Sequence, residues 1–208
     1  MGQALDRQAR AKRVIRFFDS QISELEARTQ DIPDAQKKTC FVGGIAFKGP
    51  HGFSSTEPHY PPFQFINAKN IADTVDTATI LRQSNFSKEK ILALDPQVLF
   101  LDLSTLQMGQ DQGGLYELKQ DPVYQSLTAV KNKAVFGVLP YNGYTQNHGS
   151  ILADAWFIGK ILYPEQFLDI DPAKKADQIY TFLLDKPLFS RMDAIFQHMT
   201  FKRIDLTR

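Results

Sequence analysis

Two polar segments of the sequence carry most of the side chains that could bind or transform a small molecule. Residues 47–66 hold imidazole, hydroxyl and carboxyl groups, namely His51, Ser54, Ser55, Thr56, Glu57, His59 and Tyr60. Residues 140–149 hold aromatic, amide and imidazole groups, namely Tyr141, Asn142, Tyr144, Gln146, Asn147 and His148. The second segment runs into the start of an expected helix, whose free amides and partial positive charge suit an oxyanion or a phosphate.

Enzymatic and metal-binding explanations of these segments are the weaker ones. A metal ion could be held by His51, Glu57, His59 and His148, but the sequence has no His-x-x-x-His pair for one helix face. It also lacks Gly-x-Ser-x-Gly, His-Glu-x-x-His and a complete phosphate loop, since Pro50 stands where the phosphate-loop lysine is needed. Tyr, Asn, Gln, Ser and Thr side chains favour ligand recognition over proton transfer, with loop packing and solvation as the alternative. We therefore expect no catalytic residue and no bound metal or other cofactor.

The surrounding sequence predicts strands that alternate with helices. Apolar runs at 39–46, 98–103 and 134–139 predict strands, and the continuous run at 98–103 is typical of a strand buried on both faces of a parallel sheet. A 3.6-residue apolar period predicts a helix over 3–28. Caps and prolines predict further helices at 67–75 (capped by Asn67), 88–94, from Asp121, from Ser150 to Tyr163, from Asp171, and at 191–199. The expected fold class is α/β, a three-layer α/β/α lobe with a mainly parallel sheet.

The connections between these elements differ in length. Segments that leave the strands are long, at 47–66, 104–114 and 140–149, whereas those that enter the strands are short. Ligands in open α/β sheets bind at the carboxyl ends of the strands. We therefore expect the three long segments to share one edge of the sheet and to form the functional face.

Composition excludes several classes of protein. The 208 residues carry a formal net charge of +1, which gives no general nucleic-acid footprint. The single Cys40 cannot form an internal disulfide or a multi-cysteine zinc site. No run approaches the roughly 18 apolar residues of a membrane span. Residues 1–16 are basic without an apolar segment, so we expect no signal peptide in this chain.

Four segments together resemble one family. They are Ser87 to Leu101 with its Asp95-Pro96 pair, Asp121-Pro122-Val123-Tyr124 with 127–133, Asn67 to Asp73, and Pro140-Tyr141-Asn142 through Leu162-Tyr163-Pro164-Glu165-Gln166-Phe167. In order and spacing they are similar to the C-terminal half of class III periplasmic substrate-binding proteins, which serve ABC importers of ferric siderophores, cobalamin, haem and related metal chelates. The last segment resembles an iron(III)-transport subgroup, near which one type binds molybdate or tungstate.

The resemblance implies a division of the chain and a set of functional residues. Residues 1–30 would be the remnant of an inter-lobe helix, and residues 31–208 the C-terminal lobe, without the N-terminal lobe. The cleft wall would be lined by Tyr141, Asn142, Tyr144, Gln146, His148, His51, Ser55, Thr56 and Tyr60. Gly143 replaces an expected bulky aromatic, which would leave a roomier pocket. Glu89 would dock onto the importer, as a matching acidic residue does in cobalamin-binding relatives; its place in a helix first turn offers a purely local explanation.

The expected function is solute binding without catalysis. The cargo would be an iron(III)-siderophore or a related chelate such as a corrinoid or haem; the alternatives are a molybdate or tungstate oxyanion, a lobe that binds no solute and, least favoured, a metal-dependent hydrolase. The partners would be the importer's membrane subunits, with no nucleic acid. A full-length parent would be periplasmic or lipid-anchored outside the cytoplasm. Because the apolar stripe of 3–28 is longer than one lobe needs, we expect the isolated chain to form homodimers.

Overall fold

A four-stranded parallel sheet forms the centre of the computed structural model, which describes residues 7–74 and 83–207. The strand order is β3-β1-β5-β6, and each neighbouring pair is parallel. In that order the strands are Lys69–Asn70, Thr39–Gly43, Val98–Asp102 and Val135–Val138. A separate antiparallel pair joins β2 (Ser55–Thr56) to β4 (Ser84–Asn85). The predicted α/β class with a mainly parallel sheet is confirmed.

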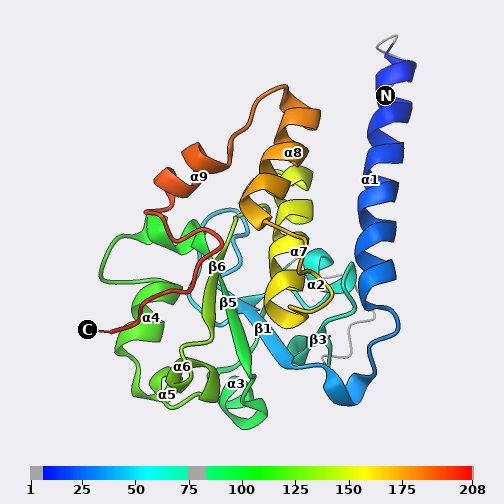
Figure 1. Ribbon diagram of the computed structural model, residues 1–208. Helices are drawn as coiled ribbons and strands as arrows, with labels where there is room; N and C mark the ends of the chain where they lie inside the picture. Colours follow the sequence, from blue (N-terminus) through cyan, green and yellow to red (C-terminus); the bar gives the residue numbers. More distant parts are fainter. Residues whose placement is uncertain (1–6, 75–82, 208) are drawn as a thin grey trace.

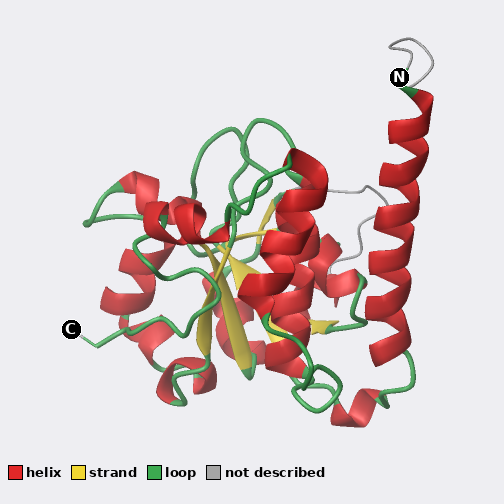
Figure 2. Ribbon diagram, turned by 45° about the horizontal axis from the view of Figure 1, so that its top comes forward, coloured by secondary structure: helices red, strands yellow, loops and turns green. Residues whose placement is uncertain are grey.

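Helices cover both faces of the sheet, as Figures 1 and 2 show. The α-helices α1 to α9 are Gln8–Thr29, Pro61–Gln64, Lys88–Leu94, Gly114–Gln120, Pro122–Gln125, Thr128–Lys131, His148–Leu162, Pro172–Leu184 and Phe189–Ile195. Within the described residues the 3-10 helices η1 to η3 are Asp34–Gln36, Ile71–Thr74 and Leu103–Met108.

Alternation along the strands creates two apolar cores. Cys40, Val42 and Phe100 face one core with α2 and α7, whereas Phe41 and Leu99 face the other with α3 to α6. Successive side chains of a strand point to opposite faces, so a continuous apolar run must be covered on both sides. The three-layer α/β/α arrangement follows from this alternation.

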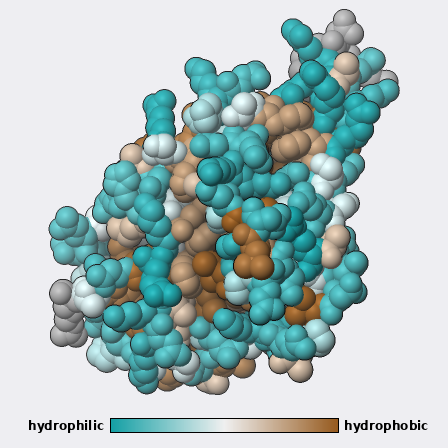
Figure 3. Space-filling view, in the orientation of Figure 1, coloured by the Kyte–Doolittle hydropathy of each residue, from teal (hydrophilic) through white to brown (hydrophobic). Residues whose placement is uncertain are grey.

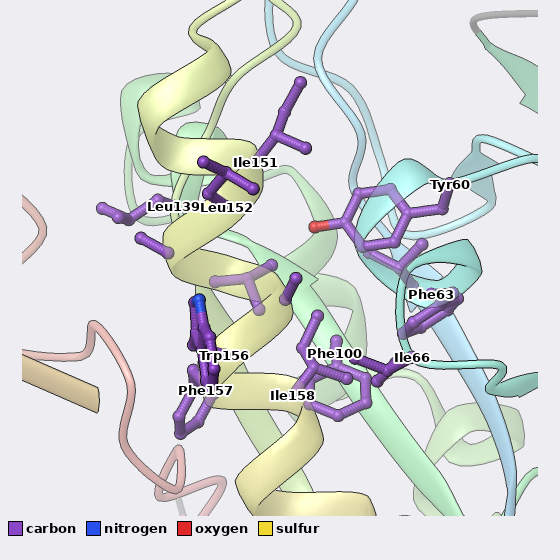
Figure 4. Packing of buried hydrophobic residues seen from close by; sticks show 14 of the residues in the cluster. Tyr60, Phe63, Ile66, Phe100, Leu139, Ile151, Leu152, Trp156, Phe157 and Ile158 are labelled. Atoms are coloured by element: carbon purple, nitrogen blue, oxygen red, sulfur yellow. The ribbon is translucent and has the colours of Figure 1, made fainter. Parts of the chain in front are cut away.

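The helix α7 lies at the centre of the first core. Part of its surface packs against α2 and the sheet, as Figure 4 shows for Ile151 and Ile158 on the side of Tyr60 and Phe63. Twelve of its fifteen residues are buried, because α1, α8 and the sheet surround it. A helix that is apolar on all sides is stable only when it is enclosed in this way.

The second half of the long helix α1 packs against the rest of the structure, which we call the α/β body. Leu25 is fully buried, and the Trp156 indole donates to Gln21 Oε1 at 3.1 Å. Arg28 pairs with Asp169 at 2.7 Å, and its guanidinium lies 5.4 Å from the Trp156 ring centroid. The helix begins at Gln8 and ends at Thr29, close to the predicted range 3–28, of which residues 3–6 lie outside the described residues.

Three local predictions differ from the structure. Asn67 has a positive φ of 50° and caps no helix; the expected helix 67–75 is instead β3 followed by η2, and residue 75 lies outside the described residues. The cap of α7 is Asn147, whose side chain accepts from the Ser150 amide, so Ser150 already lies inside the first turn. The segment 47–66, expected as one long polar loop, contains β2 and α2, and Phe53, Tyr60 and other side chains of the segment are buried.

Candidate ligand-binding face

The three long segments meet at the carboxyl edge of the sheet, as their lengths predicted. β1, β5 and β6 are parallel, so the segments after them leave from the same edge. The Lys48 amide donates to Gly143 O at 2.9 Å and so joins the first segment to the third. The Ser104 hydroxyl of the second segment donates to Gly44 O, directly after β1, at 3.4 Å. The chain crosses from β3 on one side of β1 to β5 on the other, which makes this edge the topological switch point where ligands bind in open α/β sheets.

An open recess of about 420 Å³ lies between the first and the third segment. Its lining consists of Phe47, Lys48, Asn142, Gly143, Tyr144, Thr145 and Gln146. The loop is held in shape by a bridge between Asn142 and Gln146 and by the Asn147 amide, which donates to Tyr141 O at 2.9 Å. Tyr144 is 86% exposed. We call this hollow the outer recess.

Lys48 and Phe47 belong to the outer recess, although neither was among the predicted site residues. Lys48 is exposed and has a positive φ of 56°, and its ammonium lies 5.5 Å from the Phe47 ring centroid. The lining contains this cation and no carboxylate. The available signal was a lysine within the long segment that follows β1, close to the carboxyl end of that strand.

The two histidines predicted for the site lie in different surroundings. His51 is half-buried, with Nε2 2.9 Å from Phe47 O. His148 is the exposed first residue of α7 and meets the Phe18 ring edge to face at 6.2 Å. Over residues 7–74 and 83–207, no three His, Cys, Asp or Glu side chains gather so as to hold a metal ion.

A second hollow, of about 750 Å³, separates this loop from α1. It is lined mainly by apolar residues of α1 and α8, together with Gln146 and His148 of the loop. The most exposed apolar members are Ile15, at 60%, and Leu184, at 57%. Figure 3 shows apolar surface between α1 and α8 at this level. We call this hollow the α1 groove.

Four other predicted residues, Ser55, Thr56, Tyr60 and Tyr141, lie in the interior and form hydrogen bonds beneath the outer recess. The hydroxyls of Ser55 and Thr56 donate to Ile45 O at 2.8 Å and to Val42 O at 2.7 Å, and both residues are at most 1% exposed. The Tyr60 hydroxyl donates to Asp154 Oδ2 at 3.4 Å, and the Tyr141 hydroxyl donates to Glu57 Oε2. None of these four side chains lines the outer recess.

Three buried carboxylates support this edge, and two of them were missed. We call Glu57, Asp102 and Asp154 the buried carboxylate group; they are 4%, 1% and 0% exposed. Asp154 accepts from the Leu139 amide at 2.9 Å, and Asp102 Oδ1 accepts from the Ser104 amide at 2.8 Å. Within the described residues Asp102 Oδ2 has no hydrogen-bond partner. The position of Asp102 at the end of an apolar strand was the available signal, whereas Asp154 within an apolar helix gave none.

Burial changes the proton affinity of this group and of its tyrosines. Loss of solvation raises the pKa of Asp102 to about 6, despite the opposing hydrogen bonds from Ser104. The same cause raises the pKa of Asp154 well above its usual value. Burial, reinforced by the neighbouring carboxylates, raises the pKa of Tyr60 and Tyr141. The tyrosines are therefore neutral hydrogen-bond donors.

Comparison with known proteins identifies the family. The family model described as periplasmic binding protein matches residues 1–140, which is more than half of the chain. The chain belongs to the periplasmic binding protein family. The class III resemblance seen in the sequence is thereby confirmed. No curated protein matches the sequence.

Solved periplasmic binding proteins share the fold at low identity. Molybdate-bound MolA from Haemophilus influenzae is 17% identical with a TM-score of 0.67, over 89% of this chain and 54% of that one. A solute-binding protein from Sulfurospirillum deleyianum is 17% identical with a TM-score of 0.67, over 94% of this chain and 58% of that one. The haem-binding HutB from Vibrio cholerae is 21% identical with a TM-score of 0.53, over 78% of this chain and 60% of that one. This chain therefore spans little more than half the length of the relatives that it matches.

Glu89, the residue predicted to dock onto the importer, lies away from this edge of the sheet, in α3. Glu89 is exposed in the first turn of α3, whose cap is Ser87. Its own amide and the Ser87 hydroxyl donate to the carboxylate and lower the pKa of Glu89. Glu89 is therefore accessible but already hydrogen-bonded locally. Among the described helices, none is long and apolar enough to cross a membrane.

Proposed function

We propose that this chain is a lobe of the solute-binding component of an ABC importer and that its outer recess takes part of an anionic metal chelate. The observation that carries the proposal is the lining of the recess, which combines Lys48, amide and hydroxyl side chains and the rings of Phe47 and Tyr144 and contains no carboxylate. Cations and donors suit an anion, and aromatic faces suit a flat organic ligand. No catalytic step is part of the proposal.

The size of the recess favours a chelate over a bare oxyanion. About 420 Å³ lies within the range of roughly 300–1,000 Å³ that is usual for small-molecule sites. A ferric siderophore or haem would fill such a hollow, whereas molybdate or tungstate would occupy a small part of it. MolA is a molybdate-binding relative and HutB a haem-binding one, so the oxyanion remains the second candidate cargo.

The cargo can be tested by titrating the chain with a ferric tricatecholate, haemin and molybdate. We expect the two chelates to bind more tightly than molybdate, and Lys48→Met to weaken the best chelate by about tenfold, because a charged hydrogen bond is lost. Lys38→Met removes an exposed cation remote from the recess and is the matched control. Tighter binding of molybdate would reverse the choice of cargo. Failure of all three probes would favour a lobe that binds no solute.

The second part of the proposal concerns the importer. We propose that the exposed Glu89 contacts cationic side chains of the membrane subunits. Glu89→Lys should weaken association of the binding protein with the importer, most clearly at low salt, where exposed charges steer encounter. The melting temperature should stay nearly unchanged, since surface substitutions cost under about 0.5 kcal/mol. Unchanged association would remove Glu89 from the contact.

We further propose that isolated chains associate with one another through the α1 groove. The exposed Ile15 and Leu184 lie on either side of this mainly apolar hollow, and contiguous apolar surface favours association. Sedimentation velocity at increasing concentration should show dimers. A strictly monomeric profile would contradict this part of the proposal and leave the cargo unaffected.

A further inference from the structure

The first half of α1 concentrates positive charge. Residues 7–19 contain five cations, namely Arg7, Arg10, Lys12, Arg13 and Arg16, and one carboxylate, Asp19. The whole chain has a formal net charge of only +1, so the rest of the chain is net negative. This end of the helix projects beyond the α/β body in Figure 2. The charge is therefore segregated onto one protruding element.

This arrangement is unfavourable for the helix itself. The N-terminal end of a helix carries a partial positive charge and favours carboxylates, yet the first turn of α1 has no acidic residue and Arg7 provides no side-chain cap. Lys12 and Arg16 are four residues apart and Arg13 and Arg16 three apart, and like charges at these spacings destabilise a helix. A helix that departs from its capping and charge preferences in these two ways indicates a functional constraint on the sequence.

Among the described residues, only one of these five cations, Arg10, has a hydrogen-bond partner that accounts for its position. Arg10 donates to the last carbonyls of α8, at 2.6 Å from Phe182 O and 3.3 Å from Leu183 O, where a cation is favoured. Arg7, Lys12, Arg13 and Arg16 are exposed, and no described carboxylate forms an ion pair with them.

Three of the free cations share the face of α1 that points away from the α/β body. At 3.6 residues per turn, Lys12, Arg16 and Arg13 fall within a sector of about 100° on the side opposite to Leu25 and Phe18. Leu25 is fully buried and Phe18 packs on the first core, so this sector faces solvent. The three cations line neither the outer recess nor the α1 groove.

We propose that the outer face of α1, carried by Lys12, Arg13 and Arg16, binds the surface of an anionic lipid bilayer. The three cations lie on the outer side of a projecting helix and line neither of the two hollows described above, and a projecting ridge of positive charge can lie against a flat anionic surface. Basic side chains near an anionic bilayer attract it additively and within about a Debye length. The contact is electrostatic and reversible, and it does not depend on the cargo.

The proposal can be tested by co-sedimentation of the whole chain with vesicles. At low salt we expect binding to mixed phosphatidylglycerol and phosphatidylcholine vesicles and none to phosphatidylcholine alone, with release as the salt rises. The triple variant Lys12→Gln, Arg13→Gln and Arg16→Gln should lose about a hundredfold in partitioning, at about fivefold for each cation removed. Glutamine keeps helix propensity, so the helix should be retained.

A matched triple variant separates this face from net charge. Lys38→Gln, Lys90→Gln and Lys131→Gln remove three exposed cations from other parts of the surface and should leave most of the binding intact. An equal loss in both triple variants, or equal binding to neutral vesicles, would overturn the proposal. Capture by polyglutamate without vesicle binding would also overturn it, because the face would then recognise an acidic polypeptide. Circular dichroism of each variant confirms that the helix content is unchanged.

Discussion

Tyr141 and Tyr144 lie three residues apart on one loop and have opposite surroundings. Tyr141 is 2% exposed and donates to Glu57, whereas Tyr144 is 86% exposed in the outer recess. The buried carboxylate group and the outer recess differ in the same way, since the first is enclosed and the second is open to solvent. Two side chains of one type within one segment are thus divided between supporting the edge of the sheet and lining the outer recess.

The two regions differ in what a lost contact costs. In the interior, a donor without its acceptor has no water to replace it, so the penalty is about 1–3 kcal/mol for each group. In the outer recess, water takes the place of any contact that is removed. We therefore expect substitutions below the edge to change stability and substitutions in the recess to change affinity.

The largest effect is expected for Asp154→Ala. The change leaves the Leu139 amide and the Tyr60 hydroxyl without their acceptor in a fully buried place. We expect the free energy of unfolding to fall by about 3 kcal/mol, as measured by urea denaturation. Asp19→Ala, at an exposed aspartate outside any described ion pair, is the control and should cost under about 0.5 kcal/mol. Similar costs for both variants would show that the interior group does not support the edge.

The next effect concerns pH and Asp102. Its pKa in the folded protein, about 6, lies above the ordinary 3.8, so the folded state binds the proton more tightly than the unfolded state. The contribution of Asp102 to the free energy of unfolding should therefore be complete below about pH 4, fall by up to about 3 kcal/mol between about pH 4 and 6, and change little above that. The raised pKa of Asp154 acts in the same direction.

Asp102→Asn isolates this contribution. The variant should have a flatter dependence of stability on pH between about 4 and 7 than the unchanged protein, because one titrating group is gone. Carboxylates with lowered pKa values, such as Asp169 at about 2, lose their contribution only below this window. Identical slopes for variant and parent would show that Asp102 does not titrate with a raised pKa.

A smaller effect is expected for Tyr141→Phe. The ring contact with Tyr60, at 5.6 Å between centroids, is kept, and only the hydroxyl that donates to Glu57 is removed. We expect a loss of about 1.5 kcal/mol in the free energy of unfolding, measured by denaturant titration. Tyr144→Phe removes the matching hydroxyl from the exposed ring and should leave stability unchanged. Equal effects of the two substitutions would remove the distinction between the regions.

Much of the fold was predictable from local patterns. The apolar run 98–103 could be stable only between two helical layers, and Ser87 and Asp171 accept hydrogen bonds as caps where they were expected. Prediction failed where a distant contact decided the local structure. Asn67 donates to the Thr29 hydroxyl at 3.1 Å and adopts a positive φ, which a propensity argument could not foresee.

The candidate site was predictable in place but not in detail. The unequal loop lengths predicted the shared edge that β1, β5 and β6 form. Which tyrosine of the loop points inward depends on partners far away in sequence, Glu57 for Tyr141 and Asp154 for Tyr60. Hydroxyl and amide side chains serve equally well as structural donors and as ligand donors, so their types alone cannot separate the two roles.

The smallest effect on folding, and the sharpest test of the comparison, is expected for Tyr144→Ala. The side chain is 86% exposed and belongs to a loop that is closed by backbone bonds, so stability should change by under about 0.5 kcal/mol. Affinity for a ferric tricatecholate should nevertheless fall about threefold to tenfold, because an aromatic contact of roughly 0.5–1.5 kcal/mol is removed from the recess. Titration and melting of the same sample measure both quantities. A variant that melts early and binds unchanged would place Tyr144 with Tyr141, as a support of the edge, and would leave Lys48 to carry recognition without it.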